Sequence, residues 1–350
     1  MERPRADRQV VIGVDSFGDL TTGDDGDLLG EPQNIRGLVA EGVLAEESGL
    51  DFFGLGEHHT EEIPLSAPDL VLASVAARTS RIHLGSAVTV LSSDDPVRVF
   101  QRYATLDALS SGRAEVILGR GSSTESFPLF GFDLADYDRL FEEKLELFAR
   151  LRTERPVTWS GTTRAALPGL QVHPRTTGGA LPTWVGVGGN PASVVRAARH
   201  GLSLMLAIIG GNPARFARLS ALFREATAQA GFSPLPIGVH SPGHVAATDE
   251  QAKEEYWPTY ETFLLDVRRQ RGFPKITREY FEHEVSYGSL YVGSPETVAR
   301  RIVRTMTALD ADRFDLKYGM GPMPHATLMD NLRLFGTEVA PRVREQLRKR

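Results

Sequence analysis

The amino-acid sequence predicts an α/β protein with the (β/α)8 barrel fold, in which parallel strands alternate with helices. Strand-like runs rich in β-branched residues alternate with helix-like runs from one end of the chain to the other. Several of the strand-like runs are apolar almost throughout, which is typical of parallel strands covered by helices on both faces. Eight such runs in 350 residues favour a closed barrel, with an open, doubly wound parallel sheet as the alternative.

Local sequence signals indicate where each strand and helix is expected. Strands are expected at residues 10–15, 51–56, 82–91, 114–118, 183–187, 204–209, 237–246 and 314–318. Helices are expected at residues 34–48, 69–79, 96–109, 137–151, 191–200, 213–230, 249–271, 295–308 and 324–348. Asp95-Pro96 and Ser294-Pro295 provide helix starts in which a side chain caps the first turn and proline takes the first helical position. A polar Gly/Asp loop occupies residues 18–30.

The chain is expected to form a single domain over residues 1–350, with insertions at about 153–181 and 249–289. Segments of this length outside the repeating strand–helix unit usually form lids or interface elements. The second insertion is rich in aromatic residues, which either line a substrate pocket or pack an appended helix. They are Tyr256, Trp257, Tyr260, Phe263, Tyr280, Phe281 and Tyr287.

Composition excludes several classes of protein. The chain contains no cysteine, which rules out disulfides, thiolate nucleophiles and iron–sulfur clusters and fits a reducing compartment. The net charge is −6, and the basic clusters at 268–271 and 348–350 are typical of solvated helix ends, so no nucleic-acid partner is expected. Neither a secretory signal nor an apolar run of about 18–20 residues occurs. We therefore expect a soluble, cytoplasmic protein without a membrane partner.

A Gly-Gly-Asn-Pro sequence occurs twice, at residues 188–191 and 210–213, each time directly after an expected strand. The glycines allow a ligand to approach the backbone closely, and Asn-Pro starts a helix whose free N–H groups attract anions. Two such helix starts on neighbouring strands predict a phosphate site, although the same sequence also makes an efficient turn from strand to helix.

The known nucleotide-binding fingerprints do not occur in the required context. Neither G-x-G-x-x-G after the first strand nor G-x-x-x-x-G-K-[ST] is present. A nicotinamide dinucleotide bound in the Rossmann manner is therefore disfavoured, and a cofactor with a single phosphate fits a barrel better.

Glu57, His58 and His59 come at the end of the second expected strand, which is the catalytic edge of a barrel. Because neighbours on a strand point to opposite faces, the two imidazoles cannot both reach one metal ion. His240 and His244 are four apart in a strand-like segment broken by Pro and Gly, so we expect no metal site and disfavour a metal-dependent hydrolase. We expect His58 to exchange a proton near neutral pH, or else to be a structural hydrogen-bonding group.

Arg120 follows the fourth expected strand and lies among small residues, with Gly119 before it and Gly121, Ser122 and Ser123 after it. Such a segment suits a flat ring together with a bidentate grip on an anion. Alternatively, Arg120 pairs with an acidic residue of a nearby loop.

These stretches together resemble the bacterial-luciferase-like flavin monooxygenase family almost from end to end. The matching runs are EHHTE (57–61), LDALSSGR (106–113), GRG (119–121), FGFD (130–133), PTW (182–184), IIG (208–210), MPH (323–325) and LFGTEVAP (334–341). The pattern L-D-x-L-S-x-G-R is quite specific to this family and its deazaflavin-dependent relatives.

The resemblance implies that FMN binds at the carboxyl ends of the barrel strands. His58, which matches the first histidine of the family's E-H-H, would lie over the face where reduced flavin meets O2 and would act in positioning and proton transfer. Arg120 and the turn after the fifth strand would hold the phosphate, and a non-prolyl cis peptide is implied near Ala87 and Val88. The residues implied to contact the cofactor are Ala87, Val88, Arg120, Gly121, Ser122, Val187, Gly188, Gly189, Asn190, Ser193, Ile209, Gly210, Gly211, Gly319 and Met320.

One position departs from the family pattern. Bacterial luciferase carries a reactive cysteine just before the arginine that corresponds to Arg120, whereas this chain has Gly119 there. The difference argues against light emission and against the luciferase's long-chain aldehyde specificity. It leaves flavin binding unaffected, because a small residue is sufficient there.

The sequence thus predicts a flavin-dependent oxidoreductase, specifically a monooxygenase that uses reduced FMN and O2 to oxidise a small organic substrate. Because no nicotinamide fingerprint occurs, a separate flavin reductase is expected to supply the reduced cofactor, unless NAD(P)H binds transiently. An F420-dependent oxidoreductase on the same barrel and a non-catalytic flavin-binding protein are the alternatives. The resemblance also implies a homodimer formed through the early barrel helices.

Overall fold

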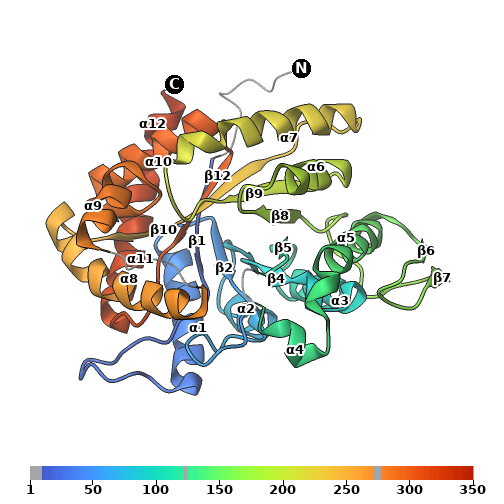
Figure 1. Ribbon diagram of the computed structural model, residues 1–350, viewed down its shortest axis with the longest axis horizontal. Helices are drawn as coiled ribbons and strands as arrows, with labels where there is room; N and C mark the ends of the chain where they lie inside the picture. Colours follow the sequence, from blue (N-terminus) through green and yellow to red (C-terminus); the bar gives the residue numbers. More distant parts are fainter. Residues whose placement is uncertain (1–9, 122–123, 272–276, 350) are drawn as a thin grey trace.

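Eight parallel strands close into a barrel, and helices cover its outer surface (Figure 1). The computed structural model describes residues 10–121, 124–271 and 277–349. The barrel strands are β1 (Val11–Ser16), β2 (Phe52–Leu55), β3 (His83–Ser86), β5 (Ala114–Gly119), β8 (Thr183–Val187), β9 (Ser203–Ala207), β10 (Ile237–Val245) and β12 (Arg313–Lys317). Each pairs with the next in parallel, and β12 pairs with β1. This closure confirms the predicted barrel and excludes the open sheet.

Most helices that cover the barrel begin within three residues of their predicted starts. The expected helix 213–230 opens with a 3-10 turn (Pro213–Phe216), and the expected helix 324–348 is divided in two by a π-helical turn (Phe335–Val339). The covering helices are α1 (Glu31–Glu47), α2 (Pro68–Ala76), α3 (Pro96–Leu109), α5 (Tyr137–Thr153), α6 (Pro191–Arg199), α7 (Ala217–Gln229), α10 (Pro295–Leu309), α11 (His325–Leu334) and α12 (Ala340–Arg348). Asp95, Asn190 and Ser294 each accept backbone N–H groups in the first turn of α3, α6 and α10, as capping predicts. No helix in the described part of the chain is long and apolar enough to cross a membrane.

The strand expected at residues 82–91 is divided into two. β3 is followed by the short strand β4 (Thr89–Val90), and both pair with β5. The peptide bond between Ala87 and Val88, which lies between these strands, is cis. Its position confirms the one that the family resemblance implied.

Two segments lie outside the repeating unit. A small antiparallel hairpin of β6 (Val157–Trp159) and β7 (Leu167–Leu170) stands between α5 and β8. The helices α8 (Asp249–Arg271) and α9 (Arg278–Tyr287) follow β10 and lead to β11 (Tyr291–Gly293), a short strand that the sequence analysis did not assign. β11 pairs with the last residues of β10, and it therefore extends the sheet locally at the rim.

The aromatic residues of the second segment mostly serve packing. Tyr256, Tyr260 and Phe281 are buried, and their ring centroids lie 5.5–6.4 Å apart. Tyr280 and Tyr287 are exposed on α9. Of the two roles that the sequence left open, the burial of these three rings supports the packing of an appended helix.

A buried charge cluster fills the amino-terminal end of the barrel. Arg313, the first residue of β12, is 1% exposed. Its guanidinium forms ion pairs of 2.7 Å with Glu115 of β5 and with Asp315 of its own strand. The guanidinium carbon also lies 3.7 Å from the ring centroid of Phe52 and 4.9 Å from that of Trp184. Because β5 and β12 stand on opposite sides of the ring of strands, the Arg313–Glu115 pair ties the barrel across its width.

The charges of this cluster compensate one another. Burial alone would raise the pKa of Glu115, but Arg313 and His83 outweigh it and hold that pKa at about 2. Burial raises the pKa of Asp315 to about 6 even beside the guanidinium. Glu115 is therefore the permanent counter-charge of Arg313, and removal of either partner would leave a charge that water does not reach.

Small residues occupy the barrel interior above this cluster. Phe52, Ile117, Trp184 and Met205 form an apolar cluster inside the barrel, together with Ala87. Nearer the carboxyl ends, the strands place Gly54, Ala87, Gly119, Gly186 and Ala207 toward the interior. Since alternate residues of a strand face the same side, this change from large to small side chains leaves a hollow at the carboxyl end.

We expect the substitution Arg313→Met to lower the free energy of unfolding by about 3–5 kcal/mol, because it leaves two buried carboxylates without their cation. Urea denaturation followed by tryptophan fluorescence measures the change. Arg333→Met is the matched control, since the pair of Arg333 with Asp330 is largely exposed, and its effect should stay within about 0.5 kcal/mol. Similar losses in the two variants would contradict a structural role of the buried cluster.

Candidate active site

A cavity of about 430 Å³ opens at the carboxyl ends of the barrel strands. Ile117 and Met205 lie at its floor, and its walls come from the ends of β1, β2, β5, β8, β9 and β10. His58 lines it together with nine of the residues predicted to contact a cofactor: Ala87, Val88, Arg120, Gly121, Val187, Gly188, Asn190, Ser193 and Ile209. Closure of the barrel thus brings together predicted residues that are up to about 150 positions apart in sequence.

One end of the cavity is built to hold an anion. The Arg120 guanidinium donates to the hydroxyl oxygen of Ser193 at 3.2 Å, and it forms an ion pair of 2.6 Å with the exposed carboxylate of Asp138. Ser193 lies in the first turn of α6, where Asn190 caps the helix through the N–H of Ala192. A guanidinium, a hydroxyl and a helix amino terminus together make a site for a phosphate or carboxylate group.

The second Gly-Gly-Asn-Pro turn differs from the first. The N–H of Gly211 donates to the Glu284 carboxylate of α9 at 2.9 Å, and the carbonyl of Gly210 accepts from Arg215. Neither glycine lines the cavity, nor does Gly189 of the first turn. The second turn therefore differs from the first in that a protein carboxylate already accepts the N–H of Gly211.

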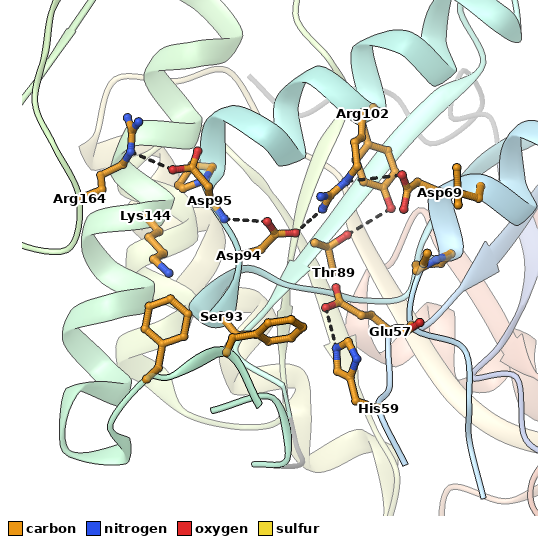
Figure 2. Close-up of a pocket in the computed structure, with 18 of the residues that line it drawn as sticks. Glu57, His59, Asp69, Thr89, Ser93, Asp94, Asp95, Arg102, Lys144 and Arg164 are labelled. Carbon is orange, nitrogen blue, oxygen red and sulfur yellow. Dashed lines mark hydrogen bonds and ion pairs between the residues drawn. The ribbon is translucent and has the colours of Figure 1, made fainter. Parts of the chain in front are cut away.

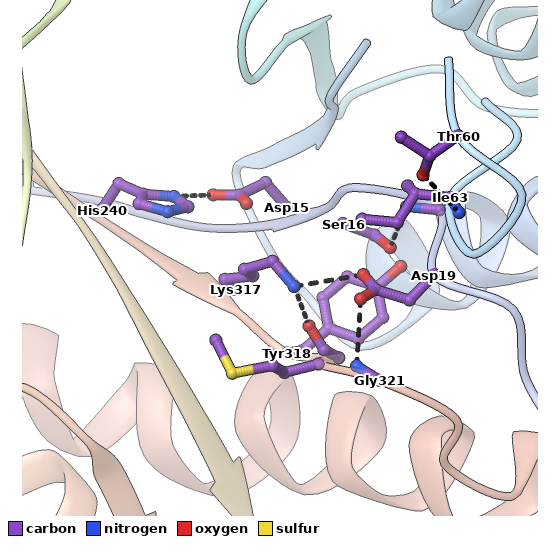
Figure 3. Close-up of polar contacts among 12 residues, drawn as sticks. Asp15, Ser16, Asp19, Thr60, Ile63, His240, Lys317, Tyr318 and Gly321 are labelled. Carbon is purple, nitrogen blue, oxygen red and sulfur yellow. Dashed lines mark hydrogen bonds and ion pairs between the residues drawn. The ribbon is translucent and has the colours of Figure 1, made fainter. Parts of the chain in front are cut away.

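Two further predicted contact residues, Gly319 and Met320, lie away from the cavity lining. The carbonyl of Gly319 accepts from the Lys317 ammonium, and the Met320 sulfur accepts from the Tyr256 hydroxyl at 3.7 Å. Asp19 accepts from the N–H of Gly321 and pairs with Lys317 at 3.2 Å (Figure 3). These contacts hold the segment after β12 against the loop that follows β1. Ser122 lies outside the described residues.

The two adjacent histidines after β2 face different surroundings. His58 packs against Phe17, with ring centroids 5.0 Å apart, and its Nδ1 lies 3.6 Å from the Glu125 carboxylate. Burial alone would raise the pKa of Glu125, but the contact with His58 helps to hold that pKa below its ordinary value. His59 instead pairs with Glu57 at 3.2 Å. The two imidazoles therefore have different partners, although both line the cavity.

A third imidazole in the cavity was missed as a site residue by the sequence analysis. His240 of β10 and Asp15 of β1 both line the cavity, and Nδ1 of His240 lies 2.7 Å from Oδ2 of Asp15 (Figure 3). The ring of Phe17 stacks on His240 at 5.9 Å, so that it stands between the two histidines. The residues are 225 positions apart, and only the closure of the barrel brings them together.

A side cavity of about 500 Å³ adjoins the first one, and Glu57 and His59 line both. Residues of its wall form ion pairs with one another. Arg102 contacts Asp69 and Asp94, and Arg164 contacts Asp95 at 3.0 Å (Figure 2). Lys144 is buried there with its ammonium donating to the Ser92 carbonyl at 2.6 Å, and burial lowers its pKa to about 8. No sequence signal pointed to this cavity, because its residues come from six separate segments.

Gly119 has no room for a side chain. A Cβ at this position would lie 2.5 Å from Cγ2 of Val88, closer than real Cβ contacts allow. Val88 is β-branched, so its side chain has few rotamers in which to turn away. The position at which luciferase carries its reactive cysteine is therefore closed to any side chain here.

In the described residues, no group of three or more histidine, aspartate or glutamate side chains could hold a metal ion. The barrel with an open cavity at the carboxyl ends of its strands has the architecture of the TIM-barrel enzymes. Within that class, the sequence matches the luciferase-like monooxygenases over residues 16–313. The chain belongs to this family.

Individual relatives match at moderate identity. The 4-hydroxyprotoasukamycin monooxygenase of Streptomyces nodosus subsp. asukaensis is 35% identical over 184 residues, which cover 49% of this chain and 48% of that protein. The alkanal monooxygenase alpha chain of the Kryptophanaron alfredi symbiont is 27% identical over 228 residues, 65% of this chain and 63% of that protein. The match thus spans less than two thirds of either monooxygenase.

Solved structures share the fold over almost the whole chain. Monooxygenase RslO1 from Streptomyces bottropensis is 26% identical with a TM-score of 0.80, covering 95% of this chain and 99% of that one. The oxygenating constituent of 3,6-diketocamphane monooxygenase from Pseudomonas putida, in complex with FMN, is 18% identical with a TM-score of 0.77 over 95% and 98%. The F420-dependent tetrahydromethanopterin reductase of Methanopyrus kandleri is 19% identical with a TM-score of 0.72 over 95% and 99%.

We expect Gly119→Ala to lower the free energy of unfolding by about 1–3 kcal/mol, because the new methyl group overlaps Val88. In a Val88→Ala background the same substitution should cost less than about 1 kcal/mol, so chemical denaturation of the four proteins yields a coupling energy. Gly188→Ala is the control, since nothing lies within 4 Å of a Cβ there. A Gly119→Ala protein as stable as wild type would refute the steric explanation.

Proposed function

We propose that this protein is a flavin-dependent monooxygenase that uses reduced FMN and O2 to oxidise a small organic substrate. The observation that carries the proposal is that one cavity is lined both by groups that can hold an anion and by apolar side chains. Arg120 and Ser193 are the anion-holding groups, beside the capped start of α6. Ile117 and Met205 are apolar side chains of the lining, and His58 lines the same cavity.

The residues present fit FMN. A singly phosphorylated cofactor needs one cluster of donors, and the first Gly-Gly-Asn-Pro turn together with Arg120 supplies it. Gly188 has nothing within 4 Å of where a Cβ would stand, which leaves room for a ligand beside the backbone. Above the floor, Gly119 and Gly186 keep the wall beside Val88 free of side chains, as a flat ring system requires.

When bound, the flavin would supply the redox chemistry with O2, and the protein would supply binding, orientation and proton transfer. Arg120 and Ser193 would hold the phosphate. His58, with Glu125 beside its Nδ1, would hold or deliver a proton at its other nitrogen. Phe17 and the buried walls would exclude bulk water from that proton.

F420 is the second candidate cofactor, because the shared fold includes F420-dependent enzymes such as the tetrahydromethanopterin reductase. Equilibrium titration with each cofactor distinguishes them. A non-catalytic flavin-binding protein is the third possibility. It predicts that His58→Ala leaves substrate-dependent oxygen uptake unchanged, whereas the proposed monooxygenase predicts a loss of about 10²–10⁴-fold.

We expect Arg120→Ala to weaken FMN binding by about 10–100-fold while the affinity for riboflavin stays unchanged, because only FMN carries the phosphate. Fluorescence titration of the two flavins measures both constants. Arg120→Lys should fall between wild type and alanine, since it keeps the charge without the fork. Arg139→Ala, which removes an exposed pair with Asp136 on α5, is the control. Equal loss of riboflavin binding would place the phosphate elsewhere.

The proposal includes a homodimer in the cytoplasm and a separate flavin reductase. We expect the purified protein with FMN to oxidise NADPH slowly, and addition of a flavin reductase to permit turnover. The decrease in NADPH absorbance under both conditions measures the effect, with heat-inactivated reductase as the control. Fast oxidation of NADPH by the purified protein alone would overturn this part of the proposal.

A further inference from the structure

The pair of His240 and Asp15 is a buried imidazole–carboxylate pair on the wall of the active-site cavity. Asp15 is 1% exposed and His240 is 7% exposed. Nδ1 of the ring meets Oδ2 of the carboxylate at 2.7 Å. A carboxylate in this position fixes the ring with its proton on Nδ1, and Nε2 is then left with a free lone pair.

Nε2 of His240 makes no hydrogen bond to any described residue, although the side chain lines the cavity. The stacked ring of Phe17, at an interplanar angle of 10°, keeps the imidazole in this orientation. Oδ1 of Asp15 is also buried without a partner among the described residues. Among the described residues, Nε2 of His240 is therefore an unpaired acceptor on a side chain that lines the cavity, and Oδ1 of Asp15 is a second unpaired acceptor buried in the wall.

Few charged groups of the described residues lie around the pair of His240 and Asp15. β12, which lies between β1 and β10, contributes Asp315 and Lys317, and the segment after β2 contributes His58 on the far side of Phe17. Lys317 pairs with Asp19 and lies 4.4 Å from the Phe17 ring centroid. In the described part of the chain, Asp15 is the carboxylate in ion-pair contact with His240, and it is positioned to stabilise an imidazolium.

A second pair on the same strand shows what a purely structural arrangement looks like. Nε2 of His244 meets Oε2 of Glu255 at 2.7 Å, and the His244 ring stacks on Tyr256 at 5.8 Å. His244 is fully buried and does not line the cavity. The two histidines have the same chemical partner, but only His240 faces the cavity.

We propose that His240, oriented by Asp15, is a general base that takes a proton from a substrate carrying an acidic hydroxyl group, such as a phenol or an enol. In this step the O–H bond breaks, an N–H bond forms at Nε2, and the electron pair stays on the substrate oxygen. Neither group is oxidised or reduced. An imidazole removes protons efficiently only from groups of comparable acidity, which a phenol or enol offers and a saturated hydrocarbon does not.

This assignment rests on the proposed function, since it places the substrate beside a flavin in the same cavity. The deprotonated substrate is the more electron-rich form, and it is the form that accepts an oxygen atom more readily. His58 and His240 would then divide the proton transfers. The Phe17 ring contacts both imidazoles, with its centroid 5.0 Å from that of His58 and 5.9 Å from that of His240. Such a division is how one cavity provides an acid and a base at the same pH.

The test uses 4-nitrophenol, whose neutral and ionised forms absorb at different wavelengths, as a probe bound to the full-length, FMN-loaded protein. We expect the pH midpoint for ionisation of the bound probe to fall by about one unit or more relative to the free probe, a tenfold change in the equilibrium. His240→Gln, which keeps a hydrogen-bonding group, should abolish the shift. Asp15→Asn should reduce it. His244→Gln is the matched control and should retain the full shift.

Three outcomes separate the possibilities. Loss of the shift in His240→Gln, together with a full shift in His244→Gln, supports the assignment. An equal shift in wild type and His240→Gln overturns it, while unchanged FMN titrations in both proteins show that the proposed function still stands. Failure of wild type to bind FMN at all overturns the proposed function instead.

A measurement without any ligand checks the same assignment. Nitrogen-15 NMR of the imidazole rings reports which nitrogen carries the proton. We expect His240 to carry it on Nδ1 in wild type, and to lose this preference in Asp15→Asn. A proton on Nε2 in the wild-type protein would overturn the proposal even if a variant failed to fold.

Discussion

The positive charge of Arg313, enclosed in the barrel, constrains much of what surrounds it. An unpaired guanidinium inside a protein is costly, so Asp315 of the same strand and Glu115 from the opposite side of the ring of strands must both reach it. The rings of Phe52 and Trp184 complete its surroundings and use up the interior volume at the amino-terminal end. The contact between β12 and β5, which are far apart in sequence, is therefore coupled to the burial of the guanidinium. Opening of the barrel would expose this charge to water.

Because large side chains fill the amino-terminal end of the barrel, its open space lies at the carboxyl end. Above Ile117 and Met205 the strands present glycine and alanine, and the resulting hollow is where the chemically active side chains meet. The loop after β2 brings His58, while β10 brings His240 from the far side of Phe17. Rigid strands fix the second histidine and a loop carries the first, which gives the two imidazoles different freedom to move when a ligand binds.

The fold could be predicted because its signals are local, and the family resemblance pointed to His58 and nine further residues that line the cavity. Alternation of apolar runs defined the eight strands, and Asn-Pro after Gly-Gly located the start of α6. The role of Gly211 could not be predicted, since its N–H meets Glu284 from a helix 73 residues away. The same holds for His240, which sequence inspection treats only in relation to His244, four residues on. Contacts that depend on barrel closure leave no mark in a short window of sequence.

The chain contains no cysteine, even at the crowded position of Gly119, and this has a practical consequence for site-specific labelling. No native thiol competes with an introduced one, so a spin label or fluorophore attached to a single new cysteine reports from one known place. Leu70 on α2 and Tyr287 on α9 are both well exposed and lie on separate parts of the surface. A pair of labels at these positions would measure in solution how far the α8–α9 segment moves relative to the barrel when a cofactor is added.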